Sequence, residues 1–156
     1  MATFGTRTAG YPTEMLRQIT LFAGCTAKEL ARADSLLCEL RLPEGTEMCR
    51  EGESGEQVFL IASGEAIVSI GEKAIATLGA GSFCGELAVL DGVPRVASVT
   101  AATDVVVFVA TRAEFMTMLA DIPSIARRMM TTIGSRLRLA DRAFTPTTEL
   151  DAADAD

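Results

Sequence analysis

The spacing of apolar residues changes twice along the chain and divides it into three segments. Residues 13–42 carry apolar positions at helical spacing, which predicts N-terminal helices. Residues 43–110 consist of short apolar runs interrupted by glycines, a pattern typical of short strands joined by tight turns. Helical spacing returns over residues 111–144. The pattern predicts one domain, residues 13–144, in which a mainly β core is flanked by helices.

Two threonines mark where helices begin. Thr26 and Glu29 have the separation of a capping box, as do Thr111 and Glu114. The first pair predicts a helix that runs to about Leu37. The later helical segment carries one apolar stripe, formed by Ile125, Met129, Ile133, Leu137, Ala140 and Phe144. The stripe leaves three roles open, because it can pack on the barrel, close over a ligand as a lid, or pair with a second copy of the chain.

The middle segment contains strand-like runs of similar length, most of them followed by a glycine-containing turn. A series of short strands at such regular spacing predicts a sandwich or a jelly-roll barrel. The strongest runs are 58–62, 66–70, 74–78, 96–100 and 105–110. Outside the domain, residues 1–12 are polar and residues 145–156 are acidic, and we expect both segments to be disordered.

Composition excludes several classes of function. The net charge is −7, so the chain lacks the basic surface of a nucleic-acid-binding protein, and we expect no nucleic acid to bind this chain alone. Histidine is absent, which removes the usual nucleophile–base pairs and histidine-ligated metals, and we predict neither an enzyme nor a metal site. The chain has no signal-peptide pattern and no membrane-spanning run, so we predict a cytoplasmic protein without a membrane partner.

The four cysteines, Cys25, Cys38, Cys49 and Cys84, form no CxxC pair. Two interpretations apply to them. They are redox sensors, or they are small buried apolar residues in a reducing cytoplasm, and the absence of a thiol motif favours the second.

The segment 83–101, here called the cassette, has the clearest chemistry. Glu86 opens a single helical turn after Gly85, and the free amides of such a turn favour an anion. Arg95 follows Pro94 and precedes an alternating strand, and a guanidinium matches the paired oxygens of a phosphate. A carboxylate beside this anion site accepts a hydrogen bond from a hydroxyl. A cyclic phosphodiester on ribose offers both groups.

The cassette resembles the phosphate-binding cassette of the cyclic nucleotide-binding domain family. The family pattern, F-G-E-L-A, a spacer, then P-R-x-A-T-V-x-A, is matched at Phe83, Gly85, Glu86, Leu87, Ala88, Pro94, Arg95, Ala97, Val99 and Ala101. The resemblance implies a double-stranded β-helix, or jelly-roll, barrel with N-terminal helices and C-terminal lid helices. It also implies that Arg95 holds the phosphate and Glu86 the ribose 2′-hydroxyl. The remaining ligand-binding residues it implies are Cys84, Gly85, Leu87, Ala88, Val96 and Ala97, with Val68 and Ile75 beside the base.

The same resemblance bears on the choice of nucleotide. In members that prefer cyclic GMP, a threonine often follows the arginine, and Val96 occupies that position here. We therefore expect cyclic AMP, with cyclic GMP less favoured. The residue that caps the base is left open among five arginines of the last helix, because Ala140 and Asp141 stand where catabolite activators carry a threonine–serine pair. These arginines are Arg127, Arg128, Arg136, Arg138 and Arg142.

Three functions are consistent with the sequence. The first is a regulatory module whose C-terminal helix responds to ligand and acts on a protein effector. The second is the sensor fragment of a transcription factor. The third is a ligand-free scaffold of the same fold, in which Glu86 and Arg95 form a structural ion pair and copies of the chain pair through the C-terminal helix.

Overall fold

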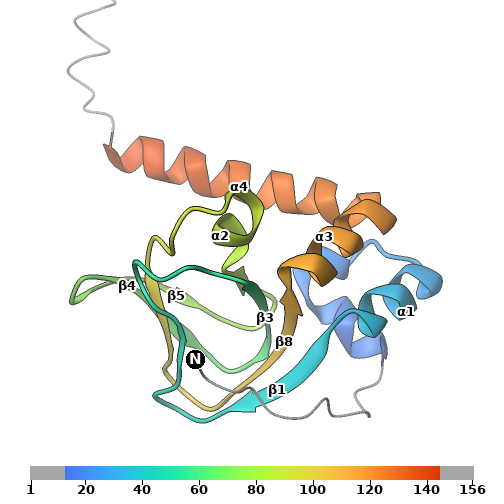
Figure 1. Cartoon of the computed structure of the whole chain (residues 1–156), viewed down its shortest axis with the longest axis horizontal. Coiled ribbons are helices and arrows are strands. Elements are labelled where there is room, and N and C mark those ends of the chain that lie inside the picture. Colours follow the sequence, from blue (N-terminus) through green and yellow to red (C-terminus); the bar gives the residue numbers. More distant parts are fainter. Residues whose placement is uncertain (1–12, 145–156) are drawn as a thin grey trace, which may run out of the picture.

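A computed structural model describes the backbone of residues 13–144 and the side chains of residues 16–138. The two segments predicted to be disordered, 1–12 and 145–156, lie outside the described residues. Figure 1 shows helices at one side of a β-barrel and a long C-terminal helix across its top. In chain order the helices are η1 (Thr13–Gln18), η2 (Thr20–Phe22), α1 (Ala27–Ser35), α2 (Glu86–Asp91), α3 (Arg112–Asp121) and α4 (Pro123–Phe144).

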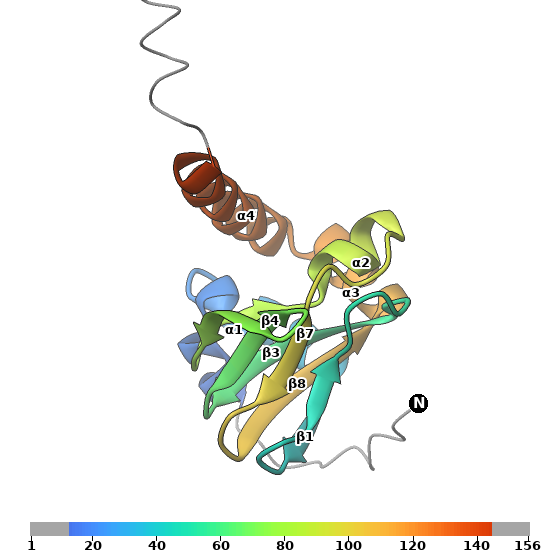
Figure 2. The ribbon, with the colours of Figure 1, turned by 90° about the vertical axis from the view of Figure 1, so that its left-hand side faces the viewer.

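The strands form two four-stranded antiparallel sheets, with orders β1-β8-β3-β6 and β2-β7-β4-β5. Figure 2 shows the two sheets from the side, with α2 and α4 at the same end of the barrel. This arrangement confirms the predicted jelly-roll. The strands are β1 (Cys38–Leu42), β2 (Glu47–Cys49), β3 (Gln57–Ser63), β4 (Ala66–Ile70), β5 (Lys73–Leu78), β6 (Phe83–Cys84), β7 (Ser98–Ala101) and β8 (Val105–Thr111).

Strand β1 differs from the prediction, which assigned all of residues 13–42 to helices. Residues 38–42 instead pair with β8, from Cys38 opposite Val109 to Leu42 opposite Val105. The partner strand lies more than sixty residues further along the chain. The apolar pattern of these five residues, just before Pro43, is too short to identify a strand. Their conformation is decided by the pairing with β8.

The sheet that contains β3 is buried on both faces. In β3, Val58 and Leu60 pack against the helices, whereas Phe59 and Ile61 face the other sheet. Burial on two faces explains why this strand reads as a continuous apolar run. The second sheet is exposed on its outer face, where Ile67 and Ile75 meet solvent. The hydrophobic core therefore has two layers, one beneath the helices and one inside the barrel.

Both predicted capping boxes are present. The Thr26 hydroxyl accepts from the Glu29 amide at 3.1 Å, and the Glu29 carboxylate accepts from the Thr26 amide at 2.9 Å. Thr111 and Glu114 repeat this exchange at the start of α3. These caps fix the starts of the helices on either side of the barrel.

The apolar stripe predicted on α4 divides into two parts. Ile125 and Met129 are buried in the core beneath the helices, and Ile133 packs at its edge. Leu137 is 61% exposed. The first turns of α4 therefore anchor the helix, and the later turns pass over the cassette (Figure 1). Among residues 13–144, no helix combines the length and the apolar character needed to cross a bilayer.

Candidate functional site

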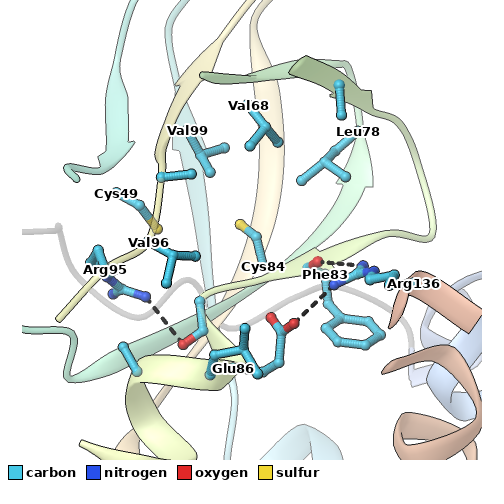
Figure 3. Close-up of a pocket in the computed structure, with 15 residues that line it drawn as sticks. Cys49, Val68, Leu78, Phe83, Cys84, Glu86, Arg95, Val96, Val99 and Arg136 are labelled. Atoms are coloured by element: carbon cyan, nitrogen blue, oxygen red, sulfur yellow. Dashed lines mark hydrogen bonds and ion pairs between the residues drawn. The ribbon is translucent and has the colours of Figure 1, made fainter. Parts of the chain in front are cut away.

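A cavity of about 320 Å³ lies between the cassette and the inner face of the second sheet. Its size falls in the range of small-molecule sites, about 300–1,000 Å³. Figure 3 shows the charged groups along one side of the cavity and apolar side chains opposite them. Nine of the ten predicted ligand-binding residues line it, namely Val68, Cys84, Gly85, Glu86, Leu87, Ala88, Arg95, Val96 and Ala97.

Ile75 is the tenth predicted residue, and it does not reach the cavity. Its side chain is 51% exposed on the outer face of the sheet. Successive side chains of a strand point to opposite faces, so the neighbouring positions Ala76 and Leu78 line the cavity in its place. The prediction for Ile75 is wrong because the local sequence does not show which face of β5 points inward.

Gly85 has the backbone conformation that the cassette needs. Its φ is +89°, in the left-handed region, and it caps the N-terminus of α2. A Cβ there would collide with the Arg95 guanidinium and lie 2.8 Å from the Gln57 carbonyl oxygen. Only glycine therefore fits the turn and lets the arginine lie against the backbone.

Arg95 is held from several sides. Its Nη1 donates to the Gly85 carbonyl at 3.1 Å, and its Nη2 donates to the Gln57 carbonyl at 3.0 Å. Its own amide and carbonyl bond to the turn between β2 and β3, at Glu53 and Gly52, both at 2.8 Å. A guanidinium has five N–H donors, so the two bonds to carbonyls orient its plane and leave capacity for an anion. Backbone groups on both sides of the guanidinium therefore fix the position of this side chain.

Glu86 is buried, with only 4% of its surface exposed to solvent. Its Oε1 accepts from Arg136 Nη1 at 2.9 Å. Burial raises the pKa of Glu86, and the bond to its own amide and the charges of Arg136 and Arg95 oppose that rise. The ion pair of Glu86 is thus with Arg136, in contrast to the structural pair with Arg95 that the scaffold hypothesis requires.

Arg136 joins α4 to the cassette through three contacts. Besides Glu86, it donates to the Phe83 carbonyl at 3.0 Å and lies 4.6 Å above the centre of the Phe83 ring. The sequence placed Arg136 among five arginines without choosing between them. No local pattern distinguishes it, because its partners lie about fifty residues earlier in the chain.

The interior of the cavity is apolar. Leu78, Val99 and the thiols of Cys49 and Cys84 surround its inner end, together with Val68 (Figure 3). Such a surface suits a flat ring, whereas the end that carries Arg95 and Glu86 suits an anion and a hydroxyl. Of these residues, Cys49, Leu78 and Val99 were not predicted to bind the ligand. Cys49 and Leu78 come from strands distant from the cassette, whereas Val99 was recognised only as part of the cassette pattern.

The sequence profile of the cyclic nucleotide-binding domain family matches residues 39–121, just over half of the chain. The chain therefore belongs to this family. It is 36% identical over 115 residues to a cAMP-dependent protein kinase regulatory subunit of Blumeria graminis, covering 72% of this chain and 29% of that protein. It is 30% identical over 144 residues to a CRP-like cAMP-activated global transcriptional regulator of Mycobacterium tuberculosis, covering 85% of this chain and 63% of that protein.

The fold has close counterparts among solved structures. The catabolite activator protein of Thermus thermophilus superimposes with a TM-score of 0.72 at 28% sequence identity. The superposition covers 86% of this chain and 63% of that chain. The chain spans 29% of the length of the kinase regulatory subunit and 63% of the length of the transcriptional regulator, less than two thirds of either relative.

Proposed function

We propose that this domain binds cyclic AMP in the cavity between the cassette and the barrel, and that α4 responds to the ligand. The observation that carries the proposal is the meeting of Arg95 and Glu86 at one end of a cavity whose other end is apolar. Arg95 pairs with the cyclic phosphate, Glu86 accepts the ribose 2′-hydroxyl, and the adenine lies toward Val68 and Val99. The names of two relatives, a cAMP-dependent kinase subunit and a cAMP-activated regulator, support the choice of nucleotide.

Isothermal titration with cyclic AMP, cyclic GMP and 5′-AMP tests this proposal. We expect cyclic AMP to bind most tightly, and Arg95→Ala to lose about 2–5 kcal/mol of binding free energy because a buried phosphate loses its charged partner. Arg41→Ala is the matched control, since the Arg41 side chain is 82% exposed on β1. Equal affinities for the wild type and Arg95→Ala, or no binding by the wild type, would contradict the proposal.

Arg136 connects α4 to the group that would bind the ribose. This side chain occupies an oxygen of Glu86, the carboxylate that the ribose hydroxyl needs. A ligand that brings a new partner to Glu86 changes the strength of its bond to Arg136, and so favours a different arrangement of α4. The first turns of α4 stay anchored by Ile125 and Met129, so the change falls on the later turns.

Hydrogen exchange with and without saturating cyclic AMP measures this response. We expect altered exchange in the turns of α4 around residue 136. Arg136→Ala should bind ligand yet lose most of the change, whereas Arg138→Ala, an exposed neighbour on the same helix, should keep it. Identical exchange in the free and bound wild type would remove the mechanism. The protein effector and the cytoplasmic location stay predictions.

A further inference from the structure

Two thiols face each other inside the cavity. Cys49 on β2 and Cys84 on β6 are both buried, both reduced, and both part of the cavity lining. Figure 3 shows their sulfur atoms turned toward each other. They belong to opposite sheets, so only the closure of the barrel brings them together. The other cysteines lie elsewhere: Cys25 is in the core beneath the helices, and Cys38 is on β1.

Both thiols lie on short edge strands. β2 has three residues and pairs with β7 alone, with a register shift between Glu47 and Cys49. β6 has two residues and pairs with β3 alone. An edge strand with an irregular register moves at less cost than a strand held on both sides. The sulfur atoms can therefore approach each other without disrupting the central strands.

The two thiols differ in acidity in a way that suits a reaction between them. The neighbouring Cys84 thiol lowers the pKa of Cys49, and the charge of Arg95 adds to that effect against the cost of burial. The pKa of Cys84 is raised by the interaction with Cys49 and by burial. Cys49 therefore forms the reactive thiolate more readily than Cys84 does, and Cys84 is placed to act as the resolving thiol.

We propose that Cys49 and Cys84 are an oxidative modification site of the cavity, at which a peroxide joins the two sulfurs in a disulfide within the chain. The Cys49 thiolate attacks one oxygen of hydrogen peroxide, the O–O bond breaks, and water leaves after protonation, so that Cys49 becomes a sulfenic acid. The Cys84 sulfur then attacks the Cys49 sulfur and displaces a second water. Two thiols and one peroxide give one disulfide and two waters.

The modification affects the segments that carry Glu86 and Arg95. Cys84 immediately precedes Gly85 and Glu86, and Cys49 precedes the turn in which the Gly52 amide bonds to the Arg95 carbonyl. A bond between the sulfurs draws these two segments together and changes the shape of the inner end of the cavity. The consequence for binding rests on the proposed function: the disulfide lowers nucleotide affinity, and bound nucleotide in turn shields the thiols.

Peptide mapping tests the modification directly. The four cysteines fall on four different tryptic peptides, residues 18–28, 33–41, 42–50 and 74–95. The full chain is treated with hydrogen peroxide, its remaining thiols are alkylated, and it is digested without reduction. We expect peptides 42–50 and 74–95 to appear linked, and the peptides of Cys25 and Cys38 to be alkylated. Links that involve Cys25 or Cys38 equally, or unlinked Cys49 and Cys84, would overturn the inference.

Titration of cyclic AMP into the reduced, oxidised and re-reduced chain tests the consequence. We expect the oxidised chain to bind about tenfold more weakly, which is about 1.4 kcal/mol, and a dithiol reductant to restore affinity. The affinity of Cys49→Ala should not change with peroxide, because this variant lacks the thiolate that reacts first, and the control Cys38→Ala should respond as the wild type does. A disulfide without an affinity change would overturn the effect on binding. A reduced chain that binds no nucleotide would instead reject the proposed function, and the peptide map would still decide the thiol pair.

Discussion

At the scale of single residues, the site depends on charged side chains that the fold buries. Glu86 is the clearest case, because its carboxylate lies inside the protein and has one arginine partner from another helix. Gly85, Glu86 and Arg95 were predicted from the sequence, because their types and spacing carry the chemistry of the cassette. Arg136 was not singled out, and Ile75 was placed wrongly, because both depend on which way a distant helix or strand faces.

The raised pKa of Glu86 predicts a pH dependence of stability. The folded state holds this proton more tightly than the unfolded state does, so its contribution is complete below the ordinary carboxyl pKa of about 4.3 and is lost as pH rises through the raised value. We expect Glu86→Gln, which cannot ionise, to lose less stability than the wild type as pH rises from about 4 to 7. Urea unfolding over this range measures the difference. The exposed control Glu65→Gln should follow the wild type, and a gap between wild type and Glu86→Gln that is constant with pH would contradict the prediction.

Val96 determines the nucleotide preference that we expect. Its side chain lines the cavity and has no hydrogen-bonding group. In Val96→Thr a hydroxyl replaces a methyl group while the side chain keeps nearly the same shape. One new hydrogen bond from this hydroxyl to the guanine, worth about 0.5–1.5 kcal/mol, should raise cyclic GMP affinity by about two- to tenfold. Competition between the two nucleotides measures the shift. A Val96→Ala variant that raises cyclic GMP affinity equally would show that space, and not the hydroxyl, is responsible.

At the scale of elements, α2 is connected to both C-terminal helices. Arg136 binds it from α4, and Arg112 at the start of α3 donates from Nη2 to the Ala88 carbonyl at 3.0 Å. The Arg112 Nε also lies 3.5 Å from Glu56. Local sequence patterns predicted where the helices start and where the main strands lie. They did not predict β1, because its pairing with β8 is long-range.

Arg112 should therefore hold α2 against α3. We expect Arg112→Ala to speed hydrogen exchange in α2 and to weaken cyclic AMP binding by a smaller factor than Arg95→Ala does, because Arg112 positions the cassette without lining the ligand cavity. The loss of a partly buried charged hydrogen bond is worth about 1.5–3 kcal/mol. The control is Arg50→Ala, which removes an exposed arginine from the turn that follows β2. Unchanged exchange in α2 would show that Arg112 has no such role.

At the scale of the whole molecule, α4 presents an apolar surface to solvent. Met130 and Leu137 are 68% and 61% exposed, and their separation of two helical turns places them on one face. We expect the chain to self-associate through this face, and the double variant Met130→Glu and Leu137→Glu to be monomeric by sedimentation velocity. Met116→Glu, at an exposed methionine of α3, should associate as the wild type does. A wild type that stays monomeric at high concentration would contradict this expectation.

The sequence by itself determined the class of fold and the chemistry of the cassette. Glycine spacing, capping boxes and apolar periodicity are local, and the groups that recognise a cyclic phosphodiester lie within nineteen residues of one another, from 83 to 101. Only the tertiary structure decided which residues complete the cavity. Arg136, Leu78 and Cys49 join the cassette there because α4 crosses the cassette and two sheets close on each other. The reason is physical: the direction of a side chain depends on strand register and helix packing, which are settled by contacts between residues far apart in the chain.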